Sequence, residues 1–149
     1  VAKLAPNPDV SMEWAKLLVL ANRPDEAIEV LKDGCSIMGP LIALKGKIID
    51  IELSRKNYNA VLECIDTILA NVSRKERWLS RRGDVLTKAG EAGAAYDTYA
   101  MALIELRSLP PKFRYLASTQ TLERYLKQKL GEETNIGSHN RNIRDEKKN

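Results

Sequence analysis

Apolar and small residues recur along this chain at intervals of three and four residues, which is the spacing of one face of an α-helix. A helix with such a pattern buries that face and leaves the other in solvent. The pattern is found at Ala27, Leu31 and Gly34, again at Val61, Ile65 and Ile68, and a third time at Ala95, Tyr99 and Ala102.

The three stripes are separated by a constant interval, because 61 − 27 and 95 − 61 both equal 34. A short turn-like segment precedes each stripe, and a second apolar stretch lies upstream of that segment. Each copy is therefore predicted to be a helix, a short turn and a second helix. The upstream apolar residues are Trp14, Leu17, Leu18 and Leu20, then Ile42, Leu44, Ile48, Ile49 and Leu53, and finally Trp78, Leu79, Val85 and Leu86.

Prolines and a capping pattern mark the boundaries of the predicted helices. Pro8 fits the first turn of a helix, and Pro110 with Pro111 separates the last two helices. Ser73 and Glu76 have the spacing of a capping box, in which the hydroxyl caps the helix and the carboxylate reaches back. We predict helices at residues 8–20, 24–34, 40–55, 58–71, 74–89, 92–107 and 111–130.

The third copy places small residues and one aromatic residue at defined positions. Gly83 lies midway in its first helix and Gly90 lies at its turn. Ala95, Tyr99 and Ala102 follow in its second helix. This pattern resembles the tetratricopeptide repeat (TPR), whose period is also 34 residues. The resemblance implies an all-α fold of antiparallel helical hairpins, stacked as a right-handed α-solenoid of about seven helices. An irregular antiparallel helical bundle is the alternative fold.

The domain organisation follows from the repeats. Residues 1–131 are predicted to form one helical repeat domain, and residues 132–149 a polar, flexible tail, because that segment has few aliphatic residues and no net charge. Within the domain we expect repeats at about 8–38, 39–72 and 73–109, followed by a capping helix at 111–130.

The charge balance argues against two classes of partner. The net charge is +4, but the acidic residues are interleaved with the basic ones, so we do not expect nucleic-acid binding. No apolar run approaches the roughly 20 residues of a membrane-spanning helix. Cys35 and Cys64 lie on apolar helical stretches and are expected to be free thiols. This favours the cytoplasm, with the periplasm as the alternative if a signal peptide has been removed.

The sequence offers no constellation of catalytic residues. His139 is the only histidine and lies in the predicted tail, where nothing would orient it as a general base. The sequence has no phosphate-binding glycine loop and no nucleophile elbow. A metal site is not expected either, because the two cysteines and one histidine do not have the spacing of a metal cluster. We therefore predict a protein that is not an enzyme and binds no cofactor or metal.

The TPR resemblance implies a concave groove lined by the first helix of each repeat, where TPR proteins bind peptides. Arg77 and Arg81 match two basic positions of the carboxylate clamp that some TPR proteins contain, whereas Lys16 and Lys47 replace its asparagines. The groove residues predicted in this way are Lys16, Lys47, Asp50, Arg77, Arg81, Asp84 and Lys88, with Arg114 and Tyr115 from the last helix.

The function predicted from these features is a non-catalytic protein-interaction module or scaffold. Its partner would be another protein or a peptide, with a preference for acidic segments. The alternatives are a regulatory or assembly segment of a larger enzyme or secretion complex, and an RNA-binding helical repeat. The sequence leaves the identity of the partner and the oligomeric state open.

Overall fold

The computed structural model describes residues 7–39 and 41–131. Every secondary-structure element in these residues is an α-helix, which confirms the predicted all-α class for this part of the chain. The helices are α1 (Pro8–Leu20), α2 (Pro24–Met38), α3 (Ile42–Ser54), α4 (Tyr58–Asn71), α5 (Glu76–Lys88), α6 (Ala92–Arg107), α7 (Pro111–Arg114) and α8 (Ala117–Leu130).

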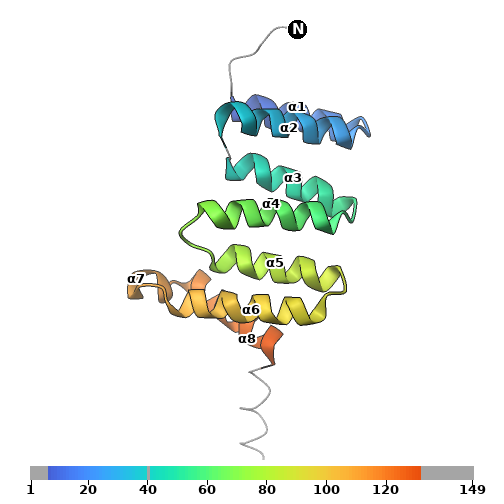
Figure 1. The fold of residues 1–149 in the computed structure, drawn as a ribbon. Coiled ribbons are helices and arrows are strands. Elements are labelled where there is room, and N and C mark those ends of the chain that lie inside the picture. The colour runs from blue at the N-terminus through green and yellow to red at the C-terminus, as the bar shows by residue number, and fades with distance from the viewer. Residues whose placement is uncertain (1–6, 40, 132–149) are drawn as a thin grey trace, which may run out of the picture. The chain divides into compact units, whose positions relative to one another are not determined.

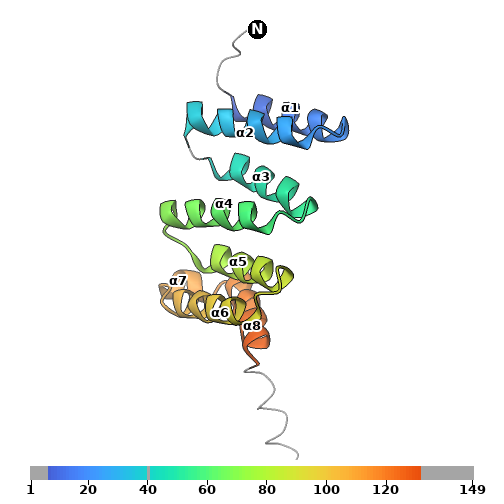
Figure 2. The same ribbon diagram turned by 45° about the vertical axis from the view of Figure 1, so that its right-hand side comes forward.

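The chain divides into two compact units, Val1–Val72 (unit 1) and Ser73–Asn149 (unit 2). In unit 1, α1 pairs with α2 and α3 pairs with α4, and α3 also packs against α1 and α2. In unit 2, α5 and α6 form a hairpin, and α8 packs against α6. The paired helices of each hairpin lie side by side in both ribbon views (Figure 1, Figure 2).

The interval of 34 residues recurs in the positions at which the helices begin. The first helices of the hairpins begin at Pro8, Ile42 and Glu76, and 42 − 8 and 76 − 42 both equal 34. The second helices begin at Pro24, Tyr58 and Ala92, and 58 − 24 and 92 − 58 also equal 34. The small residues Ala27, Val61 and Ala95 are thus each the fourth residue of a helix, and all three are buried.

The turns between paired helices repeat the same backbone geometry. Asn22, Lys56 and Gly90 have positive φ angles of 59°, 58° and 83°. Glycine adopts this left-handed conformation freely, and asparagine tolerates it better than lysine does. The next residue of each turn donates its N–H to a carbonyl five residues earlier, which is the outer bond of a Schellman motif. These bonds are Arg23 to Leu18 (2.8 Å), Asn57 to Glu52 (2.9 Å) and Glu91 to Leu86 (2.9 Å).

Side-chain sizes at equivalent positions compensate for one another. In the third hairpin, a Cβ atom at Gly83 would lie 2.5 Å from Cε1 of Tyr99, so the ring occupies the space that a side chain would fill. The other two hairpins combine residues of intermediate size at the same two positions, and all of these residues are buried. The pairs are Ala15 with Leu31, Ile49 with Ile65, and Gly83 with Tyr99.

One predicted helix end is wrong, and one predicted helix is divided into two. The second helix was predicted to end at Gly34, but α2 continues to Met38. Gly34 serves close packing instead, because a Cβ atom there would lie 3.0 Å from Cδ1 of Leu44. The last predicted helix is divided into α7 and α8, because Leu116 is extended (φ −62°, ψ 140°). The other predicted ends lie within two residues of the observed ones.

The capping box predicted at Ser73 and Glu76 is also wrong. Helix α5 begins at Glu76, its N-cap is Lys75, and no side chain caps it. Glu76 is only 1% exposed, and its Oε1 accepts hydrogen bonds from Nε of Arg74 at 2.9 Å and from Nη2 of the same residue. The Arg74 guanidinium lies over the Phe113 ring, 4.9 Å from its centre. The carboxylate thus binds the half-buried Arg74 guanidinium instead of its own backbone, and this cation links α5 to α7.

Candidate functional site

Helices α5 and α8 form the two walls of a pocket in unit 2, with a volume of about 380 Å³. The residues from each helix are spaced by three and four positions, so one face of each helix is turned to the pocket. We call this the α5–α8 pocket. Its lining consists of Arg77, Ser80, Arg81 and Asp84 from α5, and Ser118, Thr121, Leu122 and Tyr125 from α8.

The wall formed by α5 carries two cations one helical turn apart. Arg77 is exposed on α5. The guanidinium carbon of Arg81 lies 5.5 Å from the centre of the Trp78 ring, which helps to orient it. Hydroxyl groups of Ser80 and Ser118 line the same pocket and can donate hydrogen bonds, whereas the Thr121 hydroxyl already donates to the carbonyl oxygen of Ala117 at 2.9 Å. This donor set suits an anionic ligand.

The opposite end of the pocket is held by a tyrosine–aspartate cluster. Oδ1 of Asp84 accepts hydrogen bonds from the hydroxyl of Tyr99 at 2.7 Å and from the hydroxyl of Tyr125. The two rings meet edge to face with their centres 6.4 Å apart. The Tyr99 hydroxyl also lies 3.3 Å from Oγ1 of Thr87. One carboxylate therefore joins α5 to α6 and α8 and fixes Tyr125 in the pocket wall.

Burial and the Asp84 carboxylate both disfavour ionisation of the two tyrosines. Burial is the largest cause of the raised pKa of Tyr99, and the hydrogen bond to Asp84 acts in the same direction. The pKa of Tyr125 is raised further, by burial first and then by its hydrogen bond to Asp84.

The raised tyrosine pKa values predict a loss of stability in alkali. Unfolded tyrosine releases its proton near about pH 10, whereas the folded tyrosines hold theirs to higher pH. The stabilisation is therefore fully present below that pH and is lost as the pH rises above it. The unfolding free energy of the wild-type chain, measured by urea denaturation, should fall from about pH 8 to about pH 11. In Tyr125→Phe this fall should be smaller. Tyr96→Phe, at an exposed tyrosine, is the control, and equal slopes for both variants would contradict the assignment.

The structure brings together three of the residues predicted to bind a partner, namely Arg77, Arg81 and Asp84. The same helical register also gives Ser80 and Ser118 groove-facing positions, whereas the other three lining residues, Thr121, Leu122 and Tyr125, were not predicted. The helical spacing of Ser118, Thr121, Leu122 and Tyr125 was a usable signal, because one face of a helix contains all four positions. It was missed because the predicted helix at 111–130 did not include the break before Ala117.

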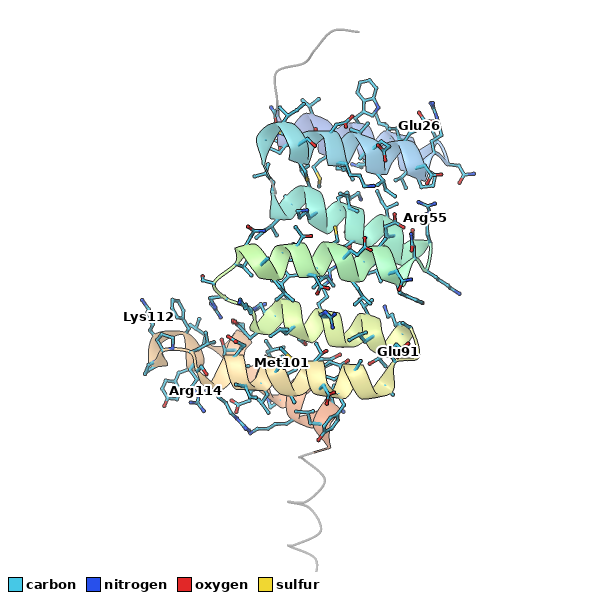
Figure 3. All side chains as sticks on the ribbon, viewed as in Figure 1. Glu26, Arg55, Glu91, Met101, Lys112 and Arg114 are labelled. Atoms are coloured by element: carbon cyan, nitrogen blue, oxygen red, sulfur yellow. The ribbon has the colours of Figure 1, made fainter. Side chains whose placement is uncertain are left out.

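Three other predicted residues of unit 2 do not line the pocket. Lys88 is exposed in the last turn of α5. Arg114 donates a hydrogen bond from Nη1 to the carbonyl oxygen of Arg107 at 3.1 Å, so it fastens α7 to the end of α6. Tyr115 is 72% exposed between α7 and α8. The side chains of Lys112 and Arg114 project from α7 (Figure 3).

The remaining predicted residues belong to unit 1. The Lys16 ammonium lies 3.9 Å from the Glu13 carboxylate on α1. Lys47 is half-buried and Asp50 is exposed, both on α3. The convergence of these residues with Arg77 and Arg81 on one groove stays a prediction.

The described residues include no group of three or more His, Cys, Asp and Glu side chains placed to hold a metal ion. His139 lies outside them. Cys35 and Cys64 are free and half-buried against the core of unit 1, and burial raises the pKa of the Cys64 thiol. None of the helices described is both long and apolar enough to cross a membrane.

No protein-family model matches the sequence. No curated protein matches it significantly.

Proposed function

We propose that this chain is a non-catalytic protein-interaction module built from three TPR-like hairpins of an α-solenoid. The support is the interval of 34 residues, which appears in the helix starts, in the buried small residues and in the left-handed turns. A repeat that cannot bury its own apolar face gains stability by stacking, and stacked hairpins offer an extended surface to partners.

The binding site in this proposal is the α5–α8 pocket, and its ligand is an acidic segment of another protein. The observation that carries the proposal is the pair Arg77 and Arg81 beside hydroxyl donors in one pocket. Guanidinium groups bind carboxylates through paired hydrogen bonds, which are stronger than bonds between neutral groups. The Leu122 side chain and the Tyr125 ring supply apolar surface in the same pocket, so an aliphatic residue beside the acid would also be bound.

The pocket is electrostatically polarised, which determines where the acid binds. Asp84 lies two helical turns after Arg77, about 10 Å along α5. The Asp84 carboxylate holds Tyr125, whereas the contact of Arg74 with Phe113 brings α7, and with it the start of α8, to the other end of α5. A ligand carboxylate is therefore expected near Arg77 and Ser118, away from the repulsion of Asp84.

The test is selection of peptides from a random displayed library on the full chain, followed by binding of the selected peptide to a double variant. We expect the selected peptides to be rich in Asp and Glu. Arg77→Gln with Arg81→Gln should weaken their binding by about tenfold or more, because charged hydrogen bonds are lost. The difference should shrink as salt is added, since these charges are near the surface.

The matched control is Lys112→Gln with Lys127→Gln, which removes the same charge from side chains outside the pocket lining. We expect this control to retain most of the affinity. Equal losses of peptide affinity in both double variants would show that the effect comes from the change in net charge and not from the pocket. Unchanged peptide affinity in the arginine double variant would show that the α5–α8 pocket is not the binding site.

A further inference from the structure

Helix α1 carries an apolar face that the described helices α2, α3 and α4 leave uncovered. Ala15 and Leu18 point into the core, whereas the opposite side of the helix is exposed. The spacing of the exposed residues follows one helix face, so they form one continuous patch. This α1 outer face consists of Val10, Trp14, Leu17 and Leu20, which are 37%, 51%, 64% and 77% exposed.

The last helix of the described chain has a different outer surface. On α8 the exposed positions spaced by one turn are Gln120, Arg124 and Gln128. The α1 outer face is apolar instead, and contiguous apolar patches of this kind mark sites of association. An exposed apolar stripe on one helix face is what each helix contributes to a helix–helix interface.

A row of charges runs along one edge of the α1 outer face. Asp9, Glu13 and Lys16 are exposed and are spaced by four and three residues, so they follow the apolar stripe. The row has acids in its first half and a base in its second half. Two such rows are complementary when the helices run in opposite directions, because Lys16 of each then faces an acid of the other. In a parallel pair, Lys16 would face Lys16 and Glu13 would face Glu13.

We propose that a second copy of this chain covers the α1 outer face, giving a two-fold symmetric dimer with antiparallel α1 helices. A two-fold axis brings the same edge of both helices together in reverse order, so the apolar stripes and the charged rows match in one arrangement. The centre of this pairing lies between Trp14 and Ala15, where Glu13 is opposite Lys16 of the partner subunit. The antiparallel helix dipoles add to the preference.

The first test is the oligomeric state of the full chain by sedimentation equilibrium. We expect the wild-type chain to dimerise at or below about 100 µM, with Leu17→Glu monomeric at the same concentration because it would bury a charge at the interface. The control is Ile104→Glu on α6. Ile104 is 65% exposed, as Leu17 is 64% exposed, so the control changes an equally accessible aliphatic residue elsewhere. A monomeric wild-type chain, or a Leu17→Glu variant that still dimerises, would overturn the proposal.

The second test addresses the direction of the helices. Lys16→Glu places acid opposite acid and should raise the dissociation constant of the dimer by about tenfold. Adding Glu13→Lys to that variant reverses both charges and should restore the wild-type constant. An additive loss in the double variant would contradict the antiparallel arrangement. Both substitutions lie outside the α5–α8 pocket, so the result does not depend on peptide binding.

Discussion

Gly83→Ala is expected to lower the free energy of unfolding by about 3 kcal/mol, the upper part of the range for overpacked cores. The new Cβ would lie 2.5, 2.7 and 2.9 Å from three atoms of the Tyr99 ring. The ring cannot simply turn away, because its hydroxyl is hydrogen-bonded to Asp84 and the ring packs at nearly a right angle to that of Tyr125. The substitution should be measured by urea denaturation followed by circular dichroism.

Gly46→Ala is the matched control for this prediction. Gly46 also lies within a helix, but a Cβ atom there would meet nothing within 4 Å. Alanine should therefore stabilise this position by about 0.5–1 kcal/mol through its better helix propensity. Gly83→Ala combined with Tyr99→Leu recreates the Ala15 and Leu31 pair of the first hairpin, so the double variant should lose less than the sum of its single changes. Similar stability for the Gly83 and Gly46 variants would contradict the packing argument.

Leu126→Ala is expected to destabilise the chain by about 2–5 kcal/mol, as large-to-small substitutions in cores do. Leu126 is fully buried on α8, which packs against α6. Because α8 forms one wall of the α5–α8 pocket, loosening it should also weaken binding of the selected acidic peptide, although Leu126 does not line the pocket. Urea denaturation and peptide titration measure the two effects separately.

Ile104→Ala provides the comparison for Leu126, since Ile104 is 65% exposed on α6. We expect it to change stability by less than about 0.5 kcal/mol and to leave peptide affinity unchanged. A Leu126 variant that is destabilised but binds peptide with full affinity would show that α8 is not needed in the ligand site.

The sequence predicts the hairpins well because their determinants are local. Each turn needs a residue that accepts a positive φ, and the helix after it needs a small residue at its fourth position, as Ala27 and Ala95 illustrate. The buried Glu76 could not be predicted in this way. Its spacing from Ser73 fits a capping box, but its carboxylate is hydrogen-bonded to Arg74 instead. The Arg74 guanidinium in turn contacts the ring of Phe113, which lies on another helix.

The candidate site was predictable only on one side. The helical register places Arg77, Arg81 and Asp84 on one face of α5, and the resemblance to TPR proteins predicts that this face lines a groove. The other wall depends on the break at Leu116, which contains neither glycine nor proline and so leaves no local signal. Tyr125 reaches Asp84 only because α8 restarts at Ala117 with a new direction, and that is a tertiary effect.

The identical spacing of helix starts limits how this protein can change in length. Each residue of an α-helix advances the side-chain direction by about 100°, so one residue gained or lost inside a helix turns every later inward-facing position away from the core. Duplication or deletion of a whole 34-residue segment between equivalent positions leaves all later helices in phase. We therefore expect the chain to tolerate the insertion of a whole hairpin. Shorter insertions should be tolerated only in the connections between helices.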